Sequence, residues 1–237
     1  MGRVKALIFD MDGVLINSEP HHKIIERQLF DELNIIVSEE EHHSYLGKSS
    51  ELMWQEIILK HNLHLSAEEL AGKNMDSILE YFSLPGKVEL ISGVKKLLEE
   101  LKQAGIPMAL ASSAEPEVID LFMKMSGLER YFIHKVSFKA VGKSKPEPDI
   151  YIHAAEQLSL YPEECLAIED SPNGIKAAKN ANMICVAFKG GSAPDNDLSM
   201  ADEIINDISL LPEILPKYLN VQFQQGVLNL LSEKNNI

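Results

Sequence analysis

The sequence lacks the features that would mark a membrane-spanning, secreted or nucleic-acid-binding protein. No run of about 18 apolar residues occurs in its 237 positions, so we expect no transmembrane helix. The apolar stretch at residues 4–9 is too short for a signal peptide and runs directly into acidic residues. Acidic residues number 36 against 22 lysines and arginines, and the net charge of -14 argues against binding to nucleic acid or anionic membranes.

Cysteine is scarce as well, and the sequence shows neither internal repeats nor low-complexity stretches. The two cysteines, Cys165 and Cys185, each lie in an apolar run, which is typical of buried thiols rather than of a disulfide. We therefore expect a cytoplasmic protein. A monomer is the expected state, with a dimer as the alternative.

Two hydrophobic patterns divide the chain. Residues 17–86 carry apolar residues at helical spacing and two capping signals, Ser38 with Glu41 and Ser66 with Glu69, which predict an all-helical unit. From residue 87 to 219, strand-like apolar runs alternate with helical segments, and this predicts a parallel sheet covered on both faces. The strand expected at residues 4–9 joins that sheet, so the helical unit is an insertion that caps it.

The expected fold is thus α/β, with a three-layer core of residues 1–16 and 87–219 and an inserted all-α cap of residues 17–86. The tail, residues 220–237, is too apolar for a plain disordered end. We interpret it as a docked C-terminal helix, with a dimer contact or a partly disordered segment as alternatives.

Two carboxylates directly follow the first expected strand. Asp10 and Asp12 are two residues apart, so in extended chain their side chains point the same way. Two close negative charges repel unless a cation lies between them or one holds a proton. Gly13 then permits a sharp exit from the strand. This pattern indicates a nucleophilic carboxylate, a second carboxyl for proton transfer and a divalent metal.

Other polar residues follow the other expected strands, where ligands bind in open parallel sheets. They form one rim of the predicted sheet together with Asp10 and Asp12: Ser112, Ser113, Glu169 and Asp170 at strand ends, and Lys145 on a loop before a helix. Core packing alone does not produce so many polar residues at one edge.

Four motifs carry these residues: Asp10-Met11-Asp12-Gly13-Val14-Leu15, Leu110-Ala111-Ser112-Ser113, Ser144-Lys145-Pro146-Glu147-Pro148-Asp149 and Ile168-Glu169-Asp170-Ser171-Pro172-Asn173-Gly174. In their order and spacing, residues 4–218 resemble the haloacid dehalogenase superfamily, in the branch of β-phosphoglucomutase-like and phosphoglycolate-phosphatase-like enzymes. The resemblance implies a Rossmann-like core under a helical-bundle cap.

The resemblance also implies a role for each core residue. Asp10 would attack phosphorus and form an aspartyl-phosphate, while Asp12 would protonate the leaving alcohol and then deprotonate water. Mg²⁺ would be held by the carboxylates of Asp10 and Asp170 and the carbonyl of Asp12, with Glu169 bound directly or through water.

The phosphoryl group would meet Ser112, Lys145 and the backbone N–H groups of Met11 and Ser113. We expect the Ser113 side chain to cap the following helix, with phosphate contact as the alternative.

Three cap residues are candidate substrate contacts. His22 lies where related caps carry a substrate-facing histidine, and Gly47 and Lys48 belong to a loop that resembles one reaching into the site. A solvated surface position is the alternative for each. β-Phosphoglucomutases typically carry an arginine where this chain has Ser50 and a tryptophan where it has Glu26, which weakens the mutase interpretation.

The sequence therefore predicts a Mg²⁺-dependent phosphatase acting on a small phosphorylated metabolite, a sugar or polyol phosphate. Asp12 favours phosphate esters, because an alkoxide leaving group needs a proton. The alternatives are a phosphohexomutase of β-phosphoglucomutase type and, more remotely, a non-catalytic binding protein on the same fold.

Overall fold

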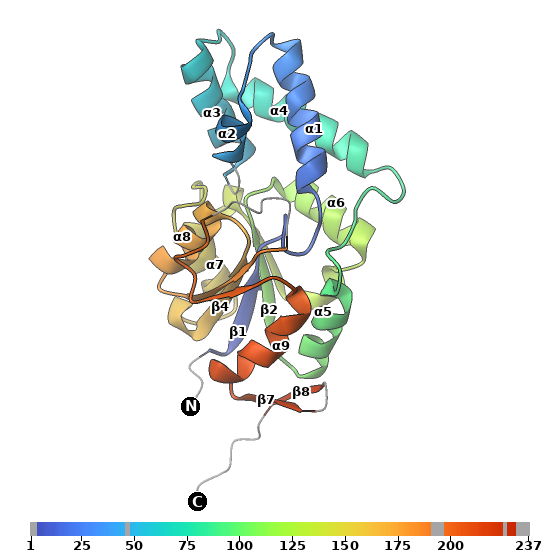
Figure 1. Cartoon of the computed structure of the whole chain (residues 1–237), viewed down its shortest axis with the longest axis vertical. Coiled ribbons are helices and arrows are strands. Elements are labelled where there is room, and N and C mark those ends of the chain that lie inside the picture. The colour runs from blue at the N-terminus through green and yellow to red at the C-terminus, as the bar shows by residue number, and fades with distance from the viewer. Residues whose placement is uncertain (1–3, 46–47, 191–196, 225–226, 231–237) are drawn as a thin grey trace, which may run out of the picture.

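A six-stranded parallel sheet forms the centre of the molecule (Figure 1). The computed structural model describes residues 4–45, 48–190, 197–224 and 227–230. The strand order is β3-β2-β1-β4-β5-β6, so the first strand joins the sheet, as expected, and lies between β2 and β4. The strands are β1 Ala6–Phe9, β2 Met108–Ser112, β3 His134–Ser137, β4 Cys165–Glu169, β5 Ile184–Phe188 and β6 Glu203–Ile205.

Helices cover both faces of this sheet, and the two faces differ in side-chain size. Helices α5 (Val94–Gln103) and α6 (Pro116–Ser126) share a core with large strand residues such as Leu7 and Phe9. Helices α7 (Asp149–Gln157) and α8 (Pro172–Asn180) pack on the opposite side chains of the same strands, which are mainly alanine and cysteine. Since successive strand residues point to opposite faces, this alternation fits a sheet buried on both sides.

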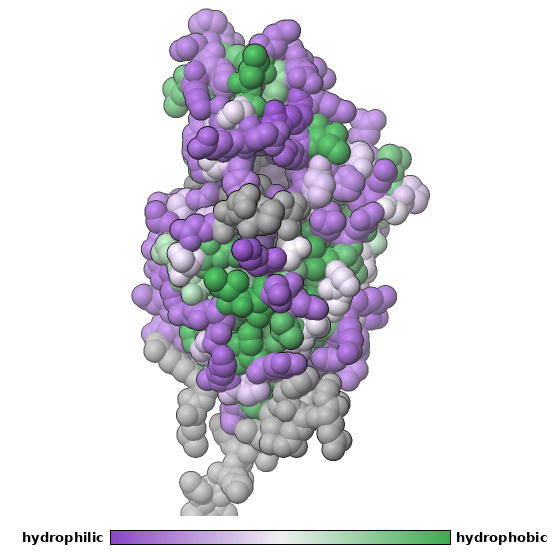
Figure 2. Space-filling view, viewed as in Figure 1, coloured by the Kyte–Doolittle hydropathy of each residue, from purple (hydrophilic) through white to green (hydrophobic). Residues whose placement is uncertain are grey.

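Four further helices lie together beyond the carboxyl ends of the strands (Figure 1), and the face of this unit seen in Figure 2 is mostly hydrophilic. They are α1 Glu19–Glu32, α2 Glu39–His43, α3 Ser50–His61 and α4 Ala67–Phe82. Ser38 and Ser66 accept hydrogen bonds from the N–H groups of Glu41 and Glu69, so both predicted caps are present. Trp54 is fully buried against Phe30 in the separate core of this unit. The predicted α/β fold with a helical cap is confirmed.

The described residues of the C-terminal tail form two paired strands, and the predicted docked helix was wrong. After the short helix α9 (Leu211–Ile214), strands β7 (Val221–Gln224) and β8 (Val227–Leu230) pair antiparallel. Val221 and Leu228 are buried in the core that includes α5. The pattern Val-Gln-Phe-Gln alternates with the period of a strand, a signal that counting apolar residues overlooks.

Two smaller features bear on the sequence expectations. Among the residues described, none of the helices combines the length and apolar character needed to cross a membrane. Cys165 and Cys185 are both free and buried, as expected.

Candidate active site

Asp10 lies at the end of the central strand β1, where the chain turns sharply. Its N–H donates to the carbonyl of Ile168 on β4 at 3.0 Å, which continues the sheet by one residue. Gly13 adopts a φ of +74°, and a Cβ built on it would lie 1.9 Å from Oδ2 of Asp170. Glycine is therefore required here for conformation and for space, and it lets the Asp10 loop approach Asp170.

Lys145 connects Asp10, which follows strand β1, with Glu169 at the end of strand β4. Its side chain is 1% exposed, and Nζ lies 2.6 Å from Asp10 Oδ1 and 2.6 Å from Glu169 Oε1. It also donates to the carbonyl of Ala111 at 3.3 Å. Burial alone would lower the pKa of Lys145, but the charges of Asp10 and Glu169 outweigh it and raise that pKa above its usual value. Lys145 is therefore a fixed cation under Asp10.

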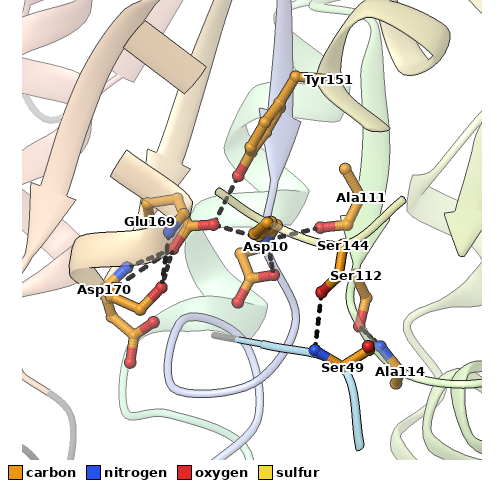
Figure 3. Close-up of polar contacts among 12 residues, drawn as sticks. Asp10, Ser49, Ala111, Ser112, Ala114, Ser144, Tyr151, Glu169 and Asp170 are labelled. Atoms are coloured by element: carbon orange, nitrogen blue, oxygen red, sulfur yellow. Dashed lines mark hydrogen bonds and ion pairs between the residues drawn. The ribbon is translucent and has the colours of Figure 1, made fainter. Parts of the chain in front are cut away.

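Glu169 is fully buried, and both of its oxygens accept hydrogen bonds (Figure 3). Oε1 receives Lys145 and the hydroxyl of Tyr151, the latter at 2.7 Å. Oε2 receives the N–H groups of Asp170 and Ser171 and the Ser171 hydroxyl, at 3.1 to 3.3 Å. Gly174 is part of this enclosure, since a Cβ there would lie 1.8 Å from Glu169 Oε1. Glu169 thus holds both Lys145 and the turn that carries Asp170.

Three carboxylates could together hold a metal ion. Ligand oxygens of Asp10, Glu169 and Asp170 lie within 4.8 Å of one another. Burial raises the pKa of Asp10 to about 8, and burial together with Glu169 raises that of Asp170 well above its usual value. A cation among them would offset this desolvation and repulsion. An all-oxygen donor set suits Mg²⁺, so these residues fit the metal expected from sequence.

Asp12 points away from this metal-ligand group and toward the cap. Its Oδ1 accepts a hydrogen bond from Ser18 and lies 3.4 Å from Nε2 of His22. Burial would raise the pKa of Asp12, but His22 and Ser18 outweigh it and hold that pKa below its usual value. In the same way, burial would lower the pKa of His22, but Asp12 raises it above the usual range. Asp12 and His22 thus form an ion pair where the core meets the cap, and either can hold the proton.

The two serines after β2 lie in different environments. Ser112 is fully buried, and its Oγ accepts the N–H of Ala114 at 3.0 Å, which leaves the hydroxyl proton able to donate (Figure 3). Ser113 lines the cavity described below. The expectation that Ser113 caps the next helix was wrong, because α6 begins after Glu115. Met11 is fully buried beside Asp10.

A cavity of about 740 Å³ separates the core from the cap. Asp10, Asp12, Lys145 and Asp170 line its floor, and α1 to α4 supply most of the opposite wall. The N–H of Ser49 in the cap donates to Ser144 Oγ in the core at 2.8 Å, so cap and core are in direct contact beside the cavity (Figure 3). The volume suits a small ligand.

The cap residues expected from sequence differ in their placement. His22 and Lys48 both line the cavity. The ammonium group of Lys48 is bound by Glu56, at 2.8 and 2.9 Å from its two carboxylate oxygens. Gly47 lies outside the described residues.

Sequence reasoning missed several residues of the site. Tyr151 lies on α7, and the sequence does not distinguish it from any other aromatic residue in the core. Nothing in the sequence around Ser144 indicates that its hydroxyl contacts the cap. Asn74 and His42 line the cavity although each is almost completely buried. Only the spatial arrangement brings these residues together.

Comparison with known proteins gives a consistent result for most of the chain. Residues 4–182 match the family model of haloacid dehalogenase-like hydrolases. The chain is 31% identical to the putative phosphatase YhcW of Bacillus subtilis, over 77% of this chain and 82% of the relative. It is 29% identical to the β-phosphoglucomutase of Bacillus subtilis, over 79% and 84%.

Two other similarities extend this picture. The chain is 32% identical to Protein SUPPRESSOR OF QUENCHING 1 of Arabidopsis thaliana over 79% of its own length, but it spans only 18% of that relative. A crystal structure of CbbY from Rhodobacter sphaeroides in complex with phosphate superimposes with a TM-score of 0.76 at 25% identity, covering 86% of this chain and 95% of that one.

Proposed function

Because the chain belongs to the haloacid dehalogenase-like hydrolases, we propose that it is a Mg²⁺-dependent phosphatase of a small phosphorylated sugar or polyol. The observation that carries the proposal is the buried arrangement of Asp10, Lys145 and Asp170 on the floor of a cavity closed by a helical cap. It provides a nucleophile, a fixed cation and a metal-binding group within one small region.

Asp10 attacks phosphorus and forms an aspartyl-phosphate, and Asp12 supplies a proton to the leaving alcohol and later removes one from water. Because its pKa is held low, Asp12 begins as a carboxylate, and the proton for the alcohol comes to it from the imidazolium of His22, whose Nε2 lies 3.4 Å from Asp12 Oδ1. The proton that Asp12 later takes from water returns to His22. Ser112, Lys145 and the N–H groups of Met11 and Ser113 bind the phosphoryl oxygens. In the cap, His22 is a candidate substrate contact, whereas the ammonium group of Lys48 is held by Glu56.

The geometry of the carboxylates supports a proposal for the residues that hold the metal. Asp10 and Asp170, with the Asp12 carbonyl, are proposed as direct ligands. Glu169 already accepts hydrogen bonds at both oxygens, which favours contact through water. Mg²⁺ would neutralise charge on the phosphoryl oxygens and lower the pKa of Asp10, so that the carboxylate is ionised when it attacks.

A substrate panel tests the proposal. We expect phosphate release from one or more phosphosugars or polyol phosphates with Mg²⁺, and none from the Asp10→Asn variant. Glu32→Gln, an exposed change at the end of α1, is the matched control and retains activity. Absence of Mg²⁺-dependent turnover across the panel, or turnover that persists in Asp10→Asn, would refute it.

Similarity to a β-phosphoglucomutase supports a second candidate, a phosphohexomutase. Such an enzyme converts β-glucose 1-phosphate to glucose 6-phosphate when primed with the bisphosphate. Net release of free glucose and phosphate under those conditions would reject the mutase and favour the phosphatase.

A further inference from the structure

The cap is joined to the core by an apolar contact on one side of the cavity. Phe82 at the end of α4 packs against Phe122 of α6 with ring centroids 4.6 Å apart, and His22 of α1 lies against both rings. Both phenylalanines are fully buried in a hydrophobic cluster that continues into the sheet. The chain returns to the core directly after Phe82, and there its two connecting segments are bridged at Ile16 and Leu90.

Two polar contacts join the cap to the core at the beginning of α3. The N–H of Ser49 donates to Ser144 Oγ at 2.8 Å, and Glu51 Oε2 lies 3.2 Å from Nζ of Lys139, on the short 3-10 helix Phe138–Ala140. We call these two contacts the latch. Figure 1 shows α3 on the left of the cap, whereas α4 meets α6 on the right.

The core residues of the latch belong to the loops that are proposed to bind the phosphoryl group. Ser144 directly precedes Lys145 in the sequence. Nζ of Lys139 also lies 3.4 Å from Glu115, a cavity-lining residue two positions after Ser113. The position of the cap is therefore coupled to the loops that hold Lys145 and Ser113.

The two attachments differ in what it costs to break them. Glu51 and Lys139 are 40% and 47% exposed, so water replaces their ion pair at small cost, and it also replaces the single hydrogen bond of Ser49. Separation of the rings of Phe82 and Phe122 would instead expose a large apolar area. The latch is thus the weaker of the two attachments.

From this difference we propose that the latch holds the cap closed, and that the cap opens by breaking it while the contact between Phe82 and Phe122 stays packed as the pivot. Substrate then enters and product leaves between α3 and the loop that carries Ser144. The inference goes beyond the proposed function, because it assigns the entry side of the cavity and two positioning residues, Lys139 and Ser144.

A reversible crosslink across the latch tests the entry side. The hydrogen bond of 2.8 Å leaves the Cα atoms of Ser49 and Ser144 within about 7 Å of each other, so Ser49→Cys with Ser144→Cys can form a disulfide. Cys165 and Cys185 are buried and should stay reduced. We expect the oxidised double variant to turn over at least about a hundredfold more slowly than the same protein after reduction.

A second crosslink on the pivot side is the matched control. The N–H of Asn17 donates to the carbonyl of Glu89 at 2.8 Å, so Asn17→Cys with Glu89→Cys joins the two connecting segments and leaves the latch untouched. Its oxidation should change turnover by less than about threefold. Equal turnover of the oxidised and reduced latch variant, or failure of that disulfide to form, would overturn the proposal.

Single substitutions separate positioning from structural damage. Lys139→Met favours the open cap, so KM should rise about threefold while kcat does not fall, and high salt should reduce the difference from wild type. Lys143→Met is the matched control, because Lys143 pairs with Asp149 within the core. Ser144→Ala should raise KM in the same way, and Ser144→Thr, which keeps the hydroxyl, should not. A fall in kcat with unchanged KM would contradict the latch.

Hydrogen exchange at the Ser49 amide, followed by NMR, measures the latch without catalysis. Lys139→Met should speed this exchange about threefold, and Lys143→Met should leave it unchanged. Exchange that responds in this way in a protein without phosphatase activity refutes the proposed function and leaves the latch standing. Unchanged exchange in Lys139→Met refutes the latch, whatever the activity of the protein.

Discussion

The core side and the cap side of the active-site cavity differ in how completely their buried polar groups are hydrogen-bonded. On the core side, Lys145 contacts three acceptors and Glu169 accepts from donors at both oxygens, so each charge is fixed by several partners. On the cap side, Asn74 and His42 each retain a buried atom without a partner in the described structure. The charged groups on the core side are therefore held in place by one another, whereas on the cap side two buried polar atoms are left without hydrogen bonds.

The largest predicted effect comes from removing the charge of the nucleophile. Asp10→Asn keeps the shape of the side chain but cannot form an aspartyl-phosphate, so kcat should fall by about four orders of magnitude or more on every substrate. Steady-state phosphate release measures the loss, and the thermal midpoint should stay near that of the wild type. A fall in kcat that is confined to some substrates would contradict the distinction between a catalytic core and a substrate-binding cap.

Metal removal is the next largest expected effect, because it acts on the same core residues. Burial raises the pKa of Asp10 even with Lys145 beside it, so loss of the metal ion favours the protonated carboxyl, which is a poor nucleophile. Treatment with EDTA should abolish phosphate release, and added Mg²⁺ should restore it. Calcium should restore less, since it prefers longer bonds and more ligands than Mg²⁺. Full activity in EDTA would contradict the proposed metal site.

Tyr151→Phe tests how far the partners of Glu169 support one another. It removes a single buried hydrogen bond at 2.7 Å, so we expect a destabilisation of about 1 kcal/mol and a fall in kcat of about tenfold or less. Urea unfolding and kinetics on two substrates measure the two effects. The fall in kcat should be equal for both substrates, because Tyr151 acts on the core side.

The pair of Asp12 and His22 joins the two walls and makes stability depend on pH. The pKa of His22 is raised from 6.5 in the folded state, so its contribution to stability is complete below that pH and is lost as pH rises through the folded value. The pKa of Asp12 is lowered from 3.8, so its contribution is present above that pH and is lost as pH falls through the folded value.

The variant His22→Gln should therefore be less stable than the wild type by about 1 kcal/mol near pH 5, with a smaller difference above the folded pKa of His22. Urea denaturation at a series of pH values provides the measurement. A difference that is constant with pH would show that the loss of packing against Phe82 and Phe122, not the loss of charge, is responsible.

The smallest predicted effect comes from a lysine that lines the cavity but is already paired. Lys48→Met breaks the ion pair with Glu56, and we expect kcat/KM for sorbitol 6-phosphate to change by less than about threefold. Lys145→Met, the same substitution on the core side, should abolish activity. If both variants lost activity equally, the cap and the core would not differ as described.

Sequence could predict the core site because its residues lie at strand ends, and parallel strands bring their carboxyl ends together. Asp10, Ser112, Glu169 and Asp170 all follow this rule, and the alternation of strands and helices gave the fold. The cap residues that line the cavity could not be predicted in the same way, because they come from helices whose mutual packing follows no simple rule. The charge on Lys48 is visible in the sequence, but its pairing with Glu56 is not.

Two predictions from the sequence, for the C-terminal tail and for the start of α6, were wrong for local reasons. The tail hairpin was missed because apolar content was considered without its period of two, although Val221-Gln222-Phe223-Gln224 carries that period. The cap of α6 was assigned to Ser113 from residue preference, but the helix begins after Glu115, at Pro116. Local preference predicts that a helix begins nearby, whereas the path of the chain decides at which residue.

The most direct test of the account is to detect phosphate on Asp10 itself. Enzyme mixed with Mg²⁺ and a substrate that it cleaves is quenched with acid within the first turnover, and the peptide containing Asp10 is analysed by mass spectrometry. We predict a phosphate on Asp10 in the wild type, dependent on Mg²⁺ and absent in Asp10→Asn. Phosphate on another residue, or an unmodified Asp10 at all times while substrate is consumed, would contradict the account.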